Sequence, residues 1–334
     1  NMTAVMCALI FAEAQGLGTV LLGISLLCLG MYAKIVGSLT LYVVWFKPSE
    51  FASVAGLTFG IGALGGLLAT SPLHILVAVL GWRMVFVVLA LITFILTVAF
   101  YYIVQDDPSQ GTRTELAPGS QNRLSVMEIC RTLLTDFSYV CISVMAGLRY
   151  GVYAAVQSLW AGPFLILYLG VPVVLAAHLL LLLNIGFILG GPLSGLLNDR
   201  IFGRPKRIML ASLFFMVLCL VGLAIEDGPE RTILLAGFLF LFGLFGGFGH
   251  IAFAHIKTLI KPELSGRAFA ITNFFSMMGG GLFIHGMGGF IGRGTAGSLS
   301  AAKNYPLAFW LCAGTLIIAA GVYAFTRDNL IADA

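Results

Sequence analysis

Long apolar segments alternate with short polar turns along almost the whole chain. Several of these segments exceed about 18 residues, which is enough for an α-helix to cross about 30 Å of hydrocarbon. The apolar positions are continuous within each segment rather than alternating, and this excludes a transmembrane β-barrel. The pattern predicts an all-α polytopic membrane protein with ten spans, at residues 1–15, 17–46, 50–80, 83–104, 138–168, 172–196, 207–225, 231–257, 264–292 and 306–326.

One connection, residues 105–137, is much longer than the others. Its first part is polar and rich in proline and glycine, which is typical of a linker. Its second part opens with Ser125-x-x-Glu128, a capping-box pattern that predicts a short amphipathic helix on the membrane surface. We therefore expect an N-terminal bundle at 1–104, a linker at 105–137 and a C-terminal bundle at 138–334.

The basic residues indicate an orientation. If the 105–137 loop lies inside, twelve of the 18 lysines and arginines are also inside and four are outside. Short loops that are rich in bases stay in the cytoplasm. We therefore expect a multi-pass protein of a cell inner or plasma membrane, with the central loop and the C-terminus in the cytoplasm.

Composition narrows the function. The chain is 60% hydrophobic and only 10% charged, and its six cysteines lie singly, without metal-ligand spacing. It contains no Walker sequence, HExxH or GxSxG. We expect no enzyme activity, no metal, no cofactor and no nucleic-acid partner. The expected partners are a small solute and the lipid bilayer, the expected state is a monomer, and the coupling ion (a proton or a sodium ion) is left open.

An internal repeat relates the two halves of the chain. A Lys-Pro pair, a threonine and a Gly-Gly pair recur at an offset of 214 residues, at 47–48, 58 and 65–66 and again at 261–262, 272 and 279–280. Repeats in the same orientation are one plan of secondary transporters. The counterpart of the second half would begin about 76 residues before residue 1. We expect two pseudo-symmetric six-helix bundles, of which this chain lacks the first two helices.

The most charged turn, Gly195–Arg207, carries a recognisable motif. Its glycines and Pro205 predict a tight turn between two apolar helices. The positions that match the motif are Gly195, Asp199, Arg200, Gly203 and Arg204. A glycine, then Asp-Arg, then Gly-Arg and further bases form the signature of the major facilitator superfamily, and the chain resembles this family. The spacing here is one residue longer than usual.

The resemblance implies a fold and a mechanism. It covers essentially the whole chain, read as spans three to twelve. In the family, spans 1, 4, 7 and 10 line a central cavity, and here 17–46, 138–168 and 231–257 match the last three. The resemblance also implies that the matched motif residues form a gate, with Asp199, Arg200 and Arg204 as a latch on the cytoplasmic side.

Two basic residues lie inside the expected cavity helices. Lys34 and Arg149 stand near the middle of spans 4 and 7, and such charges usually face water or a partner. Helical spacing places each on a face with polar and aromatic residues. The candidate substrate-binding residues are Lys34, Ser38, Tyr42, Arg149, Tyr153, Gln157, Trp160 and His250. The alternative for each cation is packing, with bonds to the backbone carbonyls of another helix. His250 is a ligand, a protonatable group or a packed histidine.

Two cations without a nearby acid favour an anionic substrate. The sequence therefore predicts a secondary active transporter that moves a small anionic organic solute by alternating access. One alternative is a drug or metabolite efflux antiporter of the same fold, although Gly62 stands where the antiporter motif of the family has proline. An alternative of another class is a receptor or assembly subunit that does not transport.

Overall fold

The computed structural model describes residues 5–6, 10, 16–47, 49–68, 71–103, 126–291 and 304–327. Every regular element in this part of the chain is a helix. The chain divides into two compact units: Asn1–Trp45 with Gly65–Leu124, and Phe46–Leu64 with Ser125–Ala334. Because helix α3 (Phe51–Leu68) crosses this division, its first part packs with the helices that follow residue 125. The domain boundaries expected from the sequence stay a prediction.

The first unit contains α2 (Leu17–Trp45), α4 (Ser71–Leu80) and α5 (Trp82–Ile103). Helices α4 and α5 contact each other. They are joined by Gly81, whose φ of 76° is a left-handed conformation that glycine adopts without a steric penalty. Gly81 is the single residue between the two helices, so the chain changes direction at this residue.

The second unit is a bundle of long helices, some of them interrupted. Its elements are α6 (Val126–Thr135), α7 (Phe137–Ala155), η1 (Val156–Trp160), α8 (Ala161–Pro163), η2 (Phe164–Tyr168), α9 (Val173–Leu196), η3 (Leu197–Phe202), α10 (Pro205–Ile225), η4 (Pro229–Arg231), α11 (Thr232–Gly246), η5 (Gly247–His250), α12 (Ile251–Leu259), α13 (Pro262–Ile291) and α15 (Asn304–Ala324). Elements η1, η2 and η3 are π-helical, and η4 and η5 are 3₁₀ turns.

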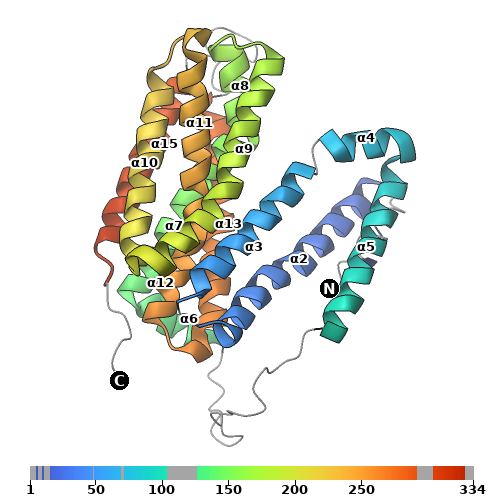
Figure 1. Ribbon diagram of the computed structural model, residues 1–334, viewed down its shortest axis with the longest axis vertical. Helices are drawn as coiled ribbons and strands as arrows, with labels where there is room; N and C mark the ends of the chain where they lie inside the picture. Colours follow the sequence, from blue (N-terminus) through green and yellow to red (C-terminus); the bar gives the residue numbers. More distant parts are fainter. Residues whose placement is uncertain are drawn as a thin grey trace, which may run out of the picture. The chain divides into compact units, whose positions relative to one another are not determined.

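The bundle is held by pairs of helices that lie side by side. Helix α7 packs on α13, α9 on α11, and α10 on α15. Figure 1 shows α12 and α6 at the end of the bundle where α15 finishes, and α8 at the opposite end. The turn between η3 and α10 also lies at the α12 end. We call this the hairpin end, after the segment Gly195–Arg207.

Helix length agrees with the spans predicted from hydropathy. Seven helical stretches among the described residues are long and apolar enough to cross a membrane, judged by length and composition. Six of them belong to the second unit and one, Trp82–Tyr102, to the first. The predicted all-α polytopic architecture is therefore confirmed. Most of the expected span 1–15, the linker up to Ser125 and the capping residue itself lie outside the described residues, and α6 begins directly after them.

The prediction of a tight turn starting at Gly195 is wrong. The helix runs through Gly195 and continues as the π-helical η3 to Phe202. It ends at Gly203, where φ is 57°, and α10 starts at Pro205, so the turn itself is only Gly203 and Arg204. Gly195 is instead needed for packing, because a Cβ there would lie 2.5 Å from the carbonyl oxygen of Ala52 in α3.

Candidate functional site

Arg149 is buried inside the second unit and bonds to the backbone of α11. Its side chain is 3% exposed, and Nη2 donates to the carbonyl oxygens of Phe245 at 2.6 Å and Gly246 at 2.8 Å. These carbonyls lie where α11 passes into the 3₁₀ turn η5, and the carbonyl of Phe245 also accepts from Ser212 Oγ at 2.9 Å. Nε is buried without a hydrogen-bond partner. The guanidinium is thus held by hydrogen bonds to the backbone, and its Nε–H donor has no partner.

No carboxylate balances this charge in the described chain. The one salt bridge found among these residues joins Arg231 to Glu226, at 3.7 Å, near the other end of the bundle. The carbonyls of Phe245 and Gly246 stabilise the guanidinium as dipoles but leave its net charge in place. A buried positive charge without a counter-charge is costly, and an anion would relieve that cost.

The other predicted residues of span 7 do not all contact the same helix. The Tyr153 ring stacks on Phe187 of α9, with ring centroids 4.8 Å apart. Gln157 donates from Nε2 to Asn184 Oδ1 of α9 at 3.0 Å. Trp160 lies against α13, where a Cβ on Gly288 would lie 3.3 Å from its ring.

The reason is the winding of this span. Residues Val156–Trp160 form a π-helix, in which the hydrogen bond runs from residue i to i+5 and each turn holds more residues. The spacing i, i+11 therefore no longer returns to the same side. The prediction of a common face for Arg149, Tyr153, Gln157 and Trp160 is wrong for Trp160, which lies against α13, whereas Tyr153 and Gln157 both contact α9. The role of each residue in binding stays a prediction.

His250 closes the 3₁₀ turn that follows α11, and it is 3% exposed. Its Nε2 lies 3.2 Å from Ser194 Oγ of α9, and its Nδ1 lies 3.2 Å from the carbonyl oxygen of Gly247. Phe59 of α3 stacks on the imidazole at a centroid distance of 5.9 Å. A Cβ on Gly56 would lie 2.8 Å from Nε2, so α3 approaches this ring closely.

Asp199 connects the hairpin end to the first turn of α3. Its Oδ2 accepts a hydrogen bond from the backbone N–H of Ser53 at 2.7 Å, and Oδ1 accepts from Asn198 Nδ2 at 2.9 Å. The first N–H groups of a helix have no partner within the helix. They form the positive end of the helix dipole, which favours a carboxylate. Asp199 thus acts as a capping residue that comes from a distant part of the chain.

The basic residues of the motif are placed differently. Arg200 and Arg204 are exposed and make no salt bridge with a described residue. Lys257 of α12 lies close enough to Asp199 for their charges to interact, and its Nζ is 4.4 Å from the centre of the Phe51 ring. That Nζ is buried without a hydrogen-bond partner. The sequence motif did not include Lys257, because it belongs to another span.

The candidate residues of the first unit lie on α2. Lys34, Ser38 and Tyr42 are helical, and Ser38 and Tyr42 are half-buried. The side chain of Lys34 lies outside the described part of the structure. The contribution of these three residues to a substrate site stays a prediction.

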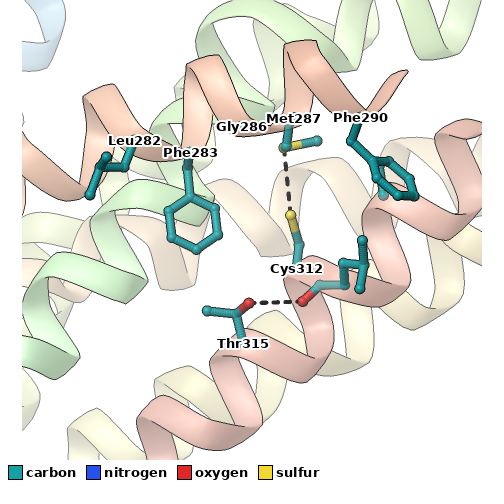
Figure 2. Close-up of a pocket in the computed structure, with 9 residues that line it drawn as sticks. Leu282, Phe283, Gly286, Met287, Phe290, Cys312 and Thr315 are labelled. Carbon is teal, nitrogen blue, oxygen red and sulfur yellow. Dashed lines mark hydrogen bonds between the residues drawn. The ribbon is translucent and has the colours of Figure 1, made fainter. Parts of the chain in front are cut away.

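A pocket on α13 and α15 is unsuitable for a charged solute. It encloses about 310 Å³ and is lined by apolar side chains such as Leu282, Phe283 and Phe290 (Figure 2). Cys312 Sγ lies 3.6 Å from Met287 Sδ, within this wall. The pocket holds no charged residue and none of the predicted site residues. Groups of three or more potential metal ligands do not occur among the described residues either.

The fold and the site together define a multi-pass membrane transport protein. A sequence profile described as Major Facilitator Superfamily matches residues 2–284, and the chain belongs to this family. The proteins of this family are transporters rather than enzymes. A comparison with curated proteins gives no match.

Solved structures support the same fold. The E. coli fucose:proton symporter FucP is 17% identical, with a TM-score of 0.70 over 98% of this chain and 83% of that one. The human organic anion transporter MFSD10 is 14% identical, with a TM-score of 0.63 over 94% and 75%. A bacterial homologue of the human lysosomal transporter Spinster is 16% identical, with a TM-score of 0.53 over 100% and 83%. At these identities the likeness concerns the fold alone.

Proposed function

We propose that this protein is a secondary active transporter that moves a small anionic organic solute by alternating access, and that Arg149 binds the anion. The observation that carries the proposal is the buried guanidinium of Arg149, which has no carboxylate partner in the described chain. Its unpartnered Nε offers a donor to a carboxylate or phosphate oxygen.

The fold by itself does not choose the solute. The structural relatives are a fucose:proton symporter and an organic anion transporter, so similar folds carry solutes of different charge. What favours an anion here is the local chemistry. A neutral sugar would leave the charge of Arg149 uncompensated, whereas an anion would neutralise it in a site shielded from water.

The proposal also assigns a side of the membrane. The hairpin end carries Arg200, Arg204, Lys206 and Arg207 within one short segment, and such basic turns stay in the cytoplasm. We therefore place the hairpin end on the cytoplasmic side of a cell inner or plasma membrane. We also propose that the protein works as a monomer.

Asp199 would serve as a cytoplasmic latch in this cycle. Its hydrogen bond to Ser53 joins the hairpin to α3, the helix whose first part packs in the second unit and whose end belongs to the first. Alternating access requires such a contact to break and re-form. The motif arginines are exposed, so Asp199 carries the latch in this conformation.

Replacing Asp199 by alanine should release the start of α3. A hydrogen bond to a charged group contributes about 1.5–3 kcal/mol, so the amide of Ser53 should exchange with solvent about 10- to 100-fold faster. Hydrogen–deuterium exchange of the peptide that contains Ser53 measures this. Asp227→Ala, a change at an exposed carboxylate in the loop after α10, is the matched control. Equal exchange in wild type and Asp199→Ala would contradict the latch.

Uptake by proteoliposomes tests the proposed function. Purified protein is reconstituted and offered radiolabelled gluconate, succinate, 2-oxoglutarate or fucose, with and without an inward proton or sodium gradient. We expect at least one of the three anions to be taken up faster than by protein-free liposomes, and fucose to be excluded. Uptake of fucose without uptake of any anion would overturn the proposal. The gradient that drives accumulation identifies the coupling ion.

A further inference from the structure

His250 and Arg149 bind to the same interrupted turn of span 10. Arg149 occupies the carbonyl oxygens of Phe245 and Gly246, and His250 faces the next one, Gly247. The guanidinium also lies against Gly249, where a Cβ would be only 2.7 Å from Nη1. The two side chains therefore belong to one buried cluster, and the charge of one acts on the other.

The hydrogen-bond partners of the imidazole are compatible with both its neutral and its protonated state. Nδ1 faces a carbonyl oxygen, which can only accept, so Nδ1 carries a hydrogen in either state. Nε2 faces the hydroxyl of Ser194, which also lies 2.8 Å from the carbonyl oxygen of Gly191. When the hydroxyl donates to Gly191, its oxygen can accept from a protonated Nε2. When the hydroxyl turns to Nε2, it donates to a neutral ring.

The proton can therefore arrive or leave while only one hydroxyl hydrogen rotates. A ring fixed between two groups that can only accept hydrogen bonds would be committed to one protonation state. Here Ser194 is completely buried, and its oxygen serves both states at the same position. The site needs no rearrangement of heavy atoms to bind a proton.

The charges around His250 oppose the protonated form until an anion is present. Helix α7 contributes Arg149, whereas α3 contributes Phe59, Gly56 and a backbone hydrogen bond with Ala52, none of which is charged. The nearest charged groups along η3 and α12 are Asp199, which bonds to Ser53, and Lys257, which lies over Phe51. No carboxylate of the described chain bonds to the ring. A second positive charge beside Arg149 is thus unfavourable, and an anion on Arg149 removes the obstacle.

Building on the proposed anion site, we propose that His250 is the proton-binding site that couples solute movement to the proton gradient. The anion on Arg149 favours protonation of Nε2, and the proton on His250 in turn strengthens binding of the anion. This reciprocity follows from linkage between two sites. When the solute is a monoanion such as gluconate, one anion and one proton enter together, and the pair adds no net charge to the buried cluster.

Two transport measurements on the same proteoliposomes separate coupling from transport. The probe is whichever of gluconate, succinate and 2-oxoglutarate the wild type takes up fastest. Counterflow, the exchange of labelled for unlabelled anion at equal pH, needs no net proton movement. Accumulation under an inward proton gradient does. For His250→Gln, we expect the ratio of accumulation to counterflow to fall at least tenfold, and uptake-linked alkalinisation outside, read with pyranine, to be lost.

Controls and a second variant make the outcomes distinct. His178→Gln, at an exposed histidine of α9, should keep the wild-type ratio. Ser194→Ala keeps the imidazole but removes the rotating hydroxyl, and it should lower the same ratio at least threefold, which provides the test if His250→Gln does not fold. The coupling role would be overturned if both variants kept the accumulation-to-counterflow ratio of the wild type. It would also be overturned if anion uptake by the wild type did not depend on the proton gradient. Absence of anion uptake in the wild type would instead overturn the proposed function.

Discussion

Replacing Gly243 by valine should strongly destabilise the helix bundle of the second unit. Helix α11 touches α9 backbone to backbone at this position, and a Cβ on Gly243 would lie 1.9 Å from the carbonyl oxygen of Leu183. The contact is reciprocal, because a Cβ on Gly190 of α9 would lie 2.0 Å from the carbonyl oxygen of Leu244. No side-chain rotation relieves an overlap with backbone atoms, so the helices must separate.

The expected loss is large because membrane helices depend on such close approach for their association. Overpacking a tight interface typically costs about 1–3 kcal/mol and can cost more, and valine adds two further carbons to the clashing one. We expect the monodisperse peak in fluorescence-detected size-exclusion chromatography to disappear, or the melting temperature to fall by about 6–12 °C.

Gly237 provides a control on the same helix. Nothing lies within 4 Å of a Cβ built there, so Gly237→Val introduces the same atoms in open space. Its melting temperature should stay close to that of the wild type. A Gly243→Val protein as stable as Gly237→Val would show that α9 and α11 do not pack as described.

Arg149→Gln should reduce anion uptake by about 100-fold. Truncating one partner of a buried charge pair costs about 2–5 kcal/mol, and 2.7 kcal/mol corresponds to about 100-fold in affinity. The measurement is initial uptake of the probe anion at concentrations below its half-saturation value. Arg231→Gln, at an exposed arginine of the same bundle, should leave uptake unchanged.

A lysine at this position separates binding from packing. Arg149→Lys keeps the positive charge but cannot reproduce the planar, multiple-donor geometry of the guanidinium. If Arg149 binds the anion, the lysine variant should transport better than the glutamine variant, because only lysine keeps the positive charge. If the residue only holds those carbonyls, lysine and glutamine should lower the melting temperature alike and leave the preference for anions over fucose intact. Wild-type uptake by Arg149→Gln would remove it from the binding site.

The spans were predictable because hydropathy is a local property. The predicted segment 138–168 coincides almost entirely with the continuous helix Phe137–Tyr168, and 306–326 lies within two residues of α15. Each span must satisfy its own backbone hydrogen bonds within the bilayer, so its length can be read without knowing its neighbours. The glycine-rich spans also indicated close packing, as the contact of Gly56 with Gly191 illustrates.

The partners of the site residues were not predictable in the same way. Asp199 bonds to Ser53, which is 146 positions away, and His250 to Ser194, which is 56 positions away. Neither pair has a sequence pattern of its own, because a backbone N–H or a single serine carries no signal. The sequence left open the alternative that Arg149 bonds to the backbone carbonyls of another helix. The choice of Phe245 and Gly246 depends on where α11 is interrupted, and adjacent glycines at 246 and 247 were the available hint.

The π-helical turns of span 7 allow one part of this helix to rotate about its axis relative to the other. In Val156–Trp160 and again in Phe164–Tyr168, the hydrogen bonds span one residue more than in an α-helix. Rewinding one such turn to the α form would rotate all that follows by about 100° and shift it by about 1.5 Å. Arg149 lies on the part that would stay fixed, and Trp160 within the part that would turn. The part of this helix that follows Val156 can thus present a different set of side chains without any tilt of the bundle.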